Sequence, residues 1–84
     1  MTRYTVVWDS AAQDELAEIW ISPSNRAAVT VAAHFIDSEL SHDASSRGTL
    51  VAEGLRALLA PPLRVLFTVN EGNRMVEVVL IRRL

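Results

Sequence analysis

Apolar and polar positions along the chain fall into short segments with recognisable periods. Tyr4–Trp8 is β-branched and aromatic and alternates between two faces, which predicts a strand. Two longer apolar runs, Leu63–Val69 and Arg74–Arg83, predict two more strands. The polar segment Asn70–Asn73 between these runs contains glycine and is typical of a short hairpin turn. The last third of the chain is therefore expected to be a pair of adjacent antiparallel strands.

The segment Leu50–Ala60 is ambiguous because its residues would also suit a helix by propensity. Gly54 within it and the Pro61-Pro62 turn after it favour a strand. We expect one strand somewhere in this segment, preceded by a polar loop, Ser41–Thr49. Gly48 is the position in that loop where unusual backbone geometry is expected.

Two segments have the period of an amphipathic helix. The first is expected to begin at Ser10, which with Gln13 three residues later matches the pattern of a capping box. Its apolar face is expected to comprise Ala12, Leu16, Ile19 and Trp20. The second helix is expected to have Ser22 as its N-cap and Pro23 at its first helical position, and to continue to about Leu40. Its apolar stripe is expected to comprise Val29, Ala32, Ile36 and Leu40, widened by Ala28, Ala33 and Phe35.

These elements predict a single α+β domain spanning residues 1–84, with the order β-α-α-β-β-β. A helical hairpin should cover one face of a mainly antiparallel, four-stranded sheet. In the strand Leu63–Val69, alternate residues from Leu63 onward would face the helices, and Arg64 would lie on the opposite, open face.

Composition narrows the class of protein. The chain has 84 residues, of which 50% are hydrophobic, so one modest core is expected. It has no cysteine, which excludes disulfides and thiolate chemistry, and no apolar run approaches the roughly 20 residues of a membrane span. No secretion signal is apparent, so the cytoplasm is the expected location. No cluster of residues has metal-ligand spacing and no glycine motif suits a cofactor phosphate, so neither group is expected.

The net charge of −2 conceals an uneven distribution. Residues 1–42 contain two basic and six acidic residues, whereas residues 43–84 contain six basic and four acidic ones. All basic residues are arginine, which suits bidentate contact with phosphate or carboxylate. A genome-wide codon bias would produce the same composition. The C-terminal half is therefore a candidate for a local arginine patch.

At this point the residues resemble a known family. The N-terminal Y-T-V-V-W-D-S-A-A-Q-D-E-L-A-E-I-W, the later R-A-L-L-A-P-P-L-R-V-L-F-T-V and the final V-E-V-V-L-I-R-R are similar to the RelE/ParE superfamily. The similarity covers about residues 4–83. Members are toxins of bacterial type II toxin–antitoxin systems, often labelled plasmid-stabilisation proteins. The resemblance implies a cognate antitoxin as partner, and either the ribosome and its messenger RNA or DNA gyrase as target.

The same resemblance points to the arginines of the predicted sheet. Arg64 matches the family's sheet arginine, and Arg82 or Arg83 lies where the family has a basic residue on the last strand. For an RNA-cleaving member, the resemblance implies Arg64, Arg83 and Arg56 as catalytic candidates. The further arginines Arg82, Arg74 and Arg47 are binding candidates. The lysines that many RelE-like enzymes carry on the second strand have no counterpart, nor does their C-terminal tail with a tyrosine or histidine.

Cleaving RNA without metal requires a base, an acid and cations that stabilise the phosphorane. Arginine supplies only the cation, because its pKa lies above about 12. The candidate proton carriers His34, His42 and Tyr4 lie on segments that are not expected near Arg64. The carboxylates Glu53 and Glu77 could approach Arg56 or Arg64 across strands, where an ordinary cross-strand ion pair is the favoured interpretation. We therefore favour a toxin that is not a nuclease. A ribosome-dependent endoribonuclease is the alternative, and a non-toxic dimerising domain, with a second copy as its partner, is a third interpretation.

Overall fold

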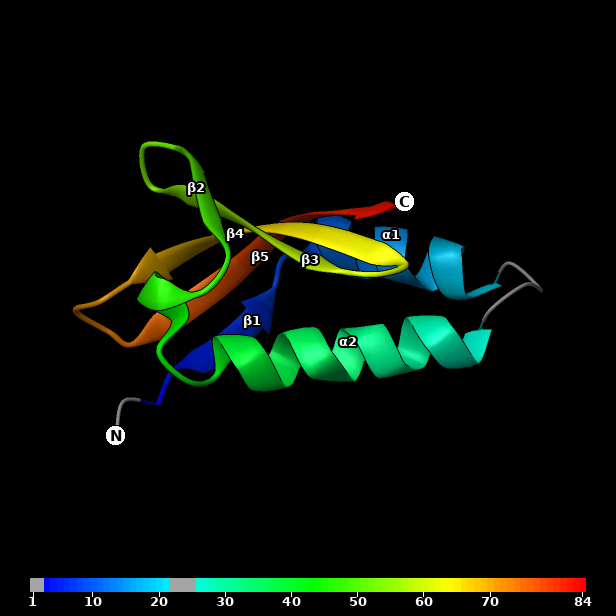
Figure 1. Cartoon of the computed structure of the whole chain (residues 1–84), viewed down its shortest axis with the longest axis horizontal. Helices are drawn as coiled ribbons and strands as arrows, with labels where there is room; N and C mark the ends of the chain where they lie inside the picture. The colour runs from blue at the N-terminus through cyan, green and yellow to red at the C-terminus, as the bar shows by residue number, and fades with distance from the viewer. Residues whose placement is uncertain (1–2, 22–25) are drawn as a thin grey trace.

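The computed structural model describes residues 3–21 and 26–84, and in these ranges two α-helices pack on a five-stranded sheet (Figure 1). The elements in chain order are β1 (Thr5–Trp8), α1 (Ser10–Ile21), α2 (Arg26–Leu40), a 3-10 turn η1 (Ala44–Ser46), β2 (Thr49–Ala52), β3 (Leu55–Ala60), β4 (Leu63–Asn70) and β5 (Met75–Arg83). The strand order is β1-β5-β4-β3-β2. Strand β1 runs parallel to β5, and the other neighbours are antiparallel. The predicted α+β class and element order are confirmed.

The strand count differs from the prediction because the segment Leu50–Ala60 contains two strands rather than one. Strands β2 and β3 form a hairpin whose turn holds Gly54 at φ 75°. Only glycine adopts this left-handed backbone at little cost, so Gly54 marks a turn inside the segment and not the interior of a strand. Figure 1 shows the β2–β3 hairpin projecting beyond the rest of the sheet.

One apolar core lies between the helices and the sheet. The predicted stripe on α2 is confirmed, since Val29, Ala32, Ile36 and Leu40 are all buried. The sheet contributes Leu63, Val65, Phe67, Val76, Val78 and Ile81, all fully buried. Three expectations were wrong: Trp20, Ala28 and Phe35 were placed on apolar faces, yet all three are exposed, Trp20 and Phe35 by about half. Each lies at the margin of its helix's buried stripe, where the partner surface does not reach.

Helix α1 is capped one residue earlier than the sequence suggested. Asp9, not Ser10, accepts a hydrogen bond at its Oδ2 from the Ala11 backbone N–H at 3.2 Å. The Gln13 side chain donates to the Trp8 carbonyl at 2.9 Å, so Gln13 does reach back across the first turn. The predicted start of α2 at Ser22 and Pro23 lies outside the described residues.

The far end of α1 is closed by a side chain from α2. Arg26 donates from Nε to the Trp20 carbonyl and from Nη2 to the Ile21 carbonyl, both at 3.1 Å. The same guanidinium lies 5.0 Å from the centroid of the Trp20 ring. These bonds satisfy carbonyls that a helix end leaves without partners, and they join the two helices. No helix in residues 3–21 and 26–84 is long and apolar enough to cross a membrane.

A bulge on β5 decides which side chains face the helices. Leu66 pairs with Leu80 and Phe67 pairs with Val78, so Val79 is an extra residue without a partner on β4. Before the bulge the even-numbered Val76 and Val78 point inward, and after it the odd-numbered Ile81 does so. The bulge therefore sends Arg82 to the open face of the sheet and Arg83 to the helix side.

Candidate functional site

Two arginines lie directly opposite each other on the open face of the sheet. Arg64 on β4 pairs with Arg82 on β5, and both side chains are exposed. Like charges that face each other across two strands destabilise a sheet. In the part of the chain that the structure describes, neither guanidinium has a carboxylate within ion-pair distance, because the single ion pair there joins Arg47 to Glu39. The pair is a concentrated positive charge available to an anionic group.

The surroundings of this arginine pair are apolar. Leu59 lies beside Arg64 on β3, and the next pair along the strands is Leu66 with Leu80. The nearest acidic position on this face is Glu77, which is opposite Thr68, four residues further along β4. Within the described residues no histidine or tyrosine lies on these rungs of the sheet. The face therefore offers two strong hydrogen-bond donors without a proton carrier beside them.

The structure assigns the other candidate arginines to different places. Arg56 pairs with the buried Phe67 and therefore lies on the helix side, where its Nε donates to the Arg47 carbonyl at 2.8 Å and its Nη2 to the Gly48 carbonyl at 3.3 Å. Arg83 pairs with the buried Leu63 and points to the same side. Neither residue joins Arg64, so the three catalytic candidates are not brought together.

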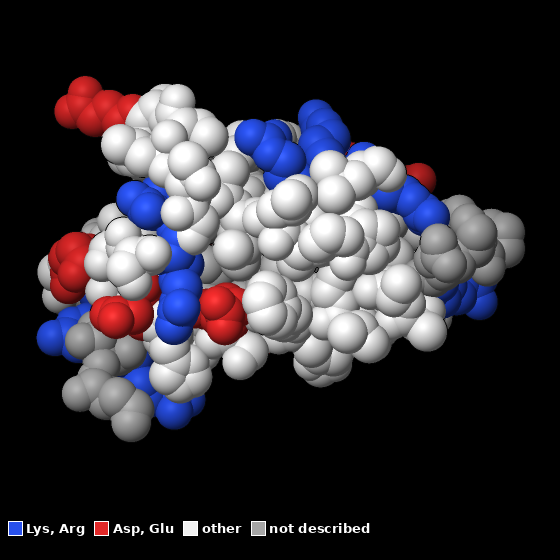
Figure 2. All heavy atoms as spheres, viewed as in Figure 1, with Lys and Arg blue, Asp and Glu red and all other residues white. Residues whose placement is uncertain are grey.

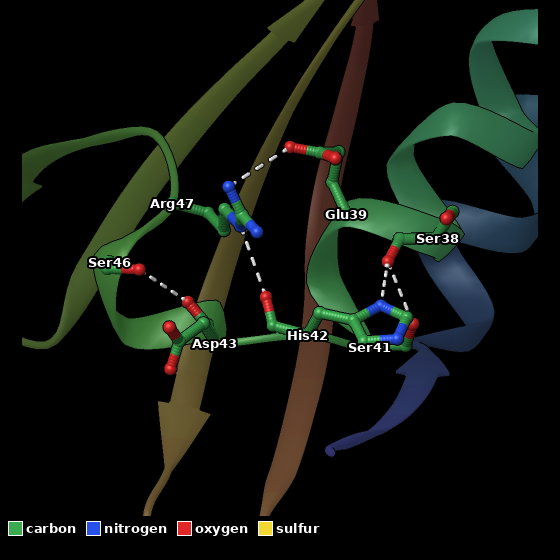
Figure 3. A network of polar contacts seen from close by, with 7 residues as sticks. All are labelled: Ser38, Glu39, Ser41, His42, Asp43, Ser46 and Arg47. Atoms are coloured by element: carbon green, nitrogen blue, oxygen red, sulfur yellow. Dashed lines mark hydrogen bonds and ion pairs between the residues drawn. The ribbon is translucent and has the colours of Figure 1, made fainter. Parts of the chain in front are cut away.

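Arg47 is held in a polar network at the end of α2 (Figure 3). Its Nη1 lies 3.6 Å from the Glu39 carboxylate, and its Nε donates to the His42 carbonyl at 3.1 Å. The ring of His42 contacts the Ser38 carbonyl and the Ser41 hydroxyl, each at 3.0 Å through Nδ1. This network anchors the loop after α2, which gives both Arg47 and His42 a structural role.

Arg74 has a backbone role in the turn between β4 and β5. Its φ of 53° is in the left-handed region, and its carbonyl accepts a hydrogen bond from the Thr5 N–H at 2.8 Å. The turn thus fixes the start of the parallel pairing between β1 and β5. The side chain is exposed, but it lies at the opposite end of β5 from Arg82.

Tyr4 is buried and connects the N-terminal strand to the same turn. Its hydroxyl donates to the Glu71 carboxylate, at 2.8 Å from Oε1 and 3.0 Å from Oε2. A hydrogen bond with Ser45 lowers the pKa of Tyr4, but the bond to Glu71, burial and the negative charge of Glu71 together raise that pKa above its ordinary value. Tyr4 is therefore a structural donor and stays protonated at neutral pH.

A groove of about 590 Å³ runs between the two helices on the side away from the arginine pair. It is lined by Trp8, Leu16, Ala17, Trp20, Thr30 and His34, among others. Trp20 donates from Nε1 to the Thr30 hydroxyl at 3.0 Å, and Trp8 donates to Asp37 at 3.4 Å. Sequence reasoning missed this groove because it placed Trp20 on the buried face of its helix. Figure 2 shows a broad uncharged surface over α2, with charged side chains gathered towards its ends.

Comparisons with known proteins identify the fold through structure and not through sequence. No protein-family model matches the chain, and no curated protein sequence is significantly similar to it. A chain of the toxin–antitoxin complex RelBE2 from Mycobacterium tuberculosis superposes with a TM-score of 0.79 at 17% identity, covering 100% of this chain and 94% of that one.

Two further structures are similar over nearly the whole chain. A chain of the archaeal RelE–RelB complex from Pyrococcus horikoshii gives a TM-score of 0.72 at 18% identity, covering 99% of this chain and 96% of that one. A chain of the chromosomal ParDE toxin–antitoxin system from P. aeruginosa gives a TM-score of 0.69 at 17% identity, covering 100% of this chain and 99% of that one. The chain therefore has the fold found in these RelE–RelB and ParD–ParE complexes, as its sequence predicted.

Proposed function

We propose that this chain is the toxin component of a type II toxin–antitoxin system, acts in the bacterial cytoplasm and is held inactive by a cognate antitoxin. Its fold over the full length supports this proposal, because the three similar structures are all toxin–antitoxin complexes. The observation that carries it is the unneutralised pair Arg64 and Arg82 on the open sheet face, next to Leu59, Leu66 and Leu80. Two arginines that face each other lower the stability of the sheet. Such a cost is expected at a functional site, here one that binds an anionic group of a target.

The toxin would act by binding rather than by cutting. Cleavage of RNA needs a group that takes a proton and another that gives one back. In the described residues, Tyr4 is engaged with Glu71, and His42 is engaged with Ser38 and Ser41, away from the arginine pair. His34 lines the groove between the helices. We therefore favour a poison of a core process such as DNA gyrase, with Arg64 and Arg82 contacting an anionic surface of the target.

The antitoxin would occupy the groove between α1 and α2 with an amphipathic helix or an extended segment. The exposed ring of Trp20 and the half-buried ring of Trp8 offer aromatic anchor points there. Acidic residues of the antitoxin would reach the arginines of the sheet, which would neutralise them. A small protein with an acidic, amphipathic tail, encoded by a neighbouring reading frame, is the expected candidate.

Induced expression in a bacterial host tests the proposal. We expect growth arrest, relief of the arrest by co-expression of the neighbouring protein, and loss of toxicity in the Arg64→Ala variant. A matched control is Arg47→Ala, which removes an arginine that lies in a structural network and not on the open face. Unimpaired growth at high expression of the wild-type chain would contradict the toxin proposal.

One observation favours the endoribonuclease alternative, because the family resemblance implies messenger cleavage for RelE-like members and gyrase poisoning for ParE-like ones. The TM-score with the RelBE2 chain, 0.79, exceeds the 0.69 with the ParDE chain. The two readings differ in what stays intact after induction. A gyrase poison should cause filamentation and DNA damage while messenger RNA remains whole. Messenger cleavage within codons during arrest, lost in Arg64→Ala, would establish the nuclease and overturn the binding mode proposed above.

A further inference from the structure

The open face of the sheet has a regular arrangement of side chains around the arginine pair. Nine residues on three neighbouring strands surround the arginine pair, and we call them the face grid: Leu55, Ala57 and Leu59 on β3, Arg64, Leu66 and Thr68 on β4, and Glu77, Leu80 and Arg82 on β5. Ala57 is itself buried, and Val7, Asn70 and Met75 continue the same face beyond the grid. The middle row is apolar, with Ala57 opposite Leu66 and Leu66 opposite Leu80. One outer row carries Leu59, Arg64 and Arg82, and the other carries Leu55, Thr68 and Glu77.

This arrangement is complementary to itself. A two-fold axis that lies in the plane of the face, crosses the strands and passes over the middle row exchanges the two outer rows. Under this operation Arg82 of one copy meets Glu77 of the other, Leu59 meets Leu55, and Arg64 meets Thr68. The middle row of one copy lies on the middle row of the other, so Leu66 packs on Leu66 and Leu80 on Leu80 of the second copy. The opposite choice, an axis along the strands, would place arginine on arginine and is repulsive.

We propose that the open sheet face is the interface of a homodimer in which two copies pack face to face with their strands antiparallel. In the free chain the occupant is a second copy, because the rows, the charges and the apolar centre of the face grid match under one symmetry operation. A target or an antitoxin that binds Arg64 and Arg82 would displace this second copy. Aligned sheet packing tolerates this geometry, with strand directions within about 30° and sheets about 10 Å apart. The bulge at Val79 is needed for this interface, because without it Arg82 would not lie on the open face.

The interface is small. Nine residues per copy fall short of the roughly 20–30 residues a side of a standard interface, so a weak, reversible dimer is expected. The two Arg82–Glu77 contacts set the register of the dimer more than its strength. The dimer would also cover Arg64 and Arg82, but its existence does not depend on the proposed function.

Sedimentation equilibrium of the purified full-length chain tests the proposal at several concentrations. The wild-type chain should show a monomer–dimer equilibrium that weakens with added salt. Arg82→Glu and Glu77→Arg should each raise the dissociation constant at least about tenfold, because each places like charges together twice per dimer. The double variant Arg82→Glu with Glu77→Arg should restore it to within about threefold of wild type.

Two controls keep this test specific. Glu18→Arg reverses an exposed charge on α1, outside the face grid, and should leave the equilibrium unchanged. Because the chain has no cysteine, Leu66→Cys provides a unique site on the symmetry axis. A bifunctional maleimide with a spacer of about 10 Å should cross-link it, and should not cross-link Glu18→Cys.

A chain that stays monomeric would overturn the proposal, and so would a dimer that is insensitive to both single reversals. Failure of the double variant to restore dimerisation, with its fold intact by circular dichroism, would also overturn it. None of these outcomes bears on toxicity, which growth arrest measures separately. Conversely, a non-toxic chain that dimerises with this charge pattern would overturn the toxin proposal and leave the dimer standing.

Discussion

Two glycines with similar backbone angles have very different surroundings. Gly48 and Gly54 have φ of 65° and 75°, both in the region that disfavours a side chain. A Cβ on Gly48 would collide with the carbonyl of Ala57 on β3, whereas a Cβ on Gly54 would meet nothing within 4 Å. The backbone angle thus affects both positions, but the close approach of strands affects only the first.

Alanine substitutions separate these two effects. Gly54→Ala should lower the free energy of unfolding by about 1–2 kcal/mol, the usual cost of the left-handed conformation. Gly48→Ala should lower it by more than about 3 kcal/mol, because the sheet edge must also move. Urea unfolding of both variants measures the difference. Equal losses would show that the collision with Ala57 is relieved without cost.

Tyr4 makes the stability of the protein sensitive to alkaline pH. Its folded pKa is raised above the ordinary value of 10.0, so the folded chain holds the phenol proton more tightly than the unfolded chain. The resulting stabilisation is complete below about pH 10 and is lost as pH rises through the folded pKa. Tyr4 is the one tyrosine, and the chain has no lysine or cysteine, so no other side chain titrates in this range.

Urea unfolding from about pH 9 to 12 measures this effect, together with the absorbance of the phenolate. The wild-type chain should lose stability as the absorbance rises, and the midpoint should lie above that of a denatured sample. The Tyr4→Phe variant should be less stable at pH 9 and should show a flatter profile above it. A steep alkaline loss in Tyr4→Phe would assign the pH dependence to another group.

At the scale of elements, the bulge on β5 determines which arginine can act on the open face. Arg82 lies beside Arg64, and Arg83 lies on the helix side opposite Leu63. If the proposed toxic surface is correct, Arg82→Ala should reduce growth arrest at least about tenfold, measured as surviving colonies after induction. Arg83→Ala, the matched neighbour, should leave the arrest nearly unchanged. The reverse result would place the functional surface on the other side of β5.

The same strand shows where sequence reasoning succeeded and where it could not. Strict alternation along β4 predicted its buried side and the position of Arg64, because β4 has no bulge. On β5 the pattern M-V-E-V-V-L-I-R-R is apolar on both sides of the bulge, so alternation alone does not fix the face of Arg82. That face depends on the register between Leu66 and Leu80, which arises from pairing and not from local sequence.

In the helices and the β2–β3 hairpin, too, the local pattern predicted some features, whereas others depended on tertiary packing. The buried stripe of α2 was predictable because its four residues are all apolar and recur at helical spacing. Trp20 was misplaced because helical spacing identifies an apolar side but not how far the partner surface extends. The extra strand was missed because a hairpin turn at Gly54 and a single glycine inside one strand look alike in sequence. The groove between the helices depends on the first two of these facts, the packing of α2 and the position of Trp20.

At the scale of the whole molecule, the helix groove and the arginine pair lie on opposite sides of the sheet. Both helices pack on the face that holds Leu63 and Val65, whereas Arg64 lies on the other face. If the antitoxin is anchored in the groove, then neutralisation and toxicity should be separable by mutation. Ala17 is a suitable position, because it is exposed, lines the groove and lies on α1 rather than in the core.

Replacing Ala17 by arginine should block the groove without weakening the helix, since arginine has nearly the helix propensity of alanine. The Ala17→Arg variant should still arrest growth, but co-expression of the antitoxin should no longer relieve the arrest. In a pull-down, affinity for the antitoxin should fall at least about tenfold. Glu18→Arg adds an arginine at the next, exposed position outside the groove and should remain neutralised. Full neutralisation of Ala17→Arg would instead place the main antitoxin contact on the sheet, where it would compete with the second copy for Arg82.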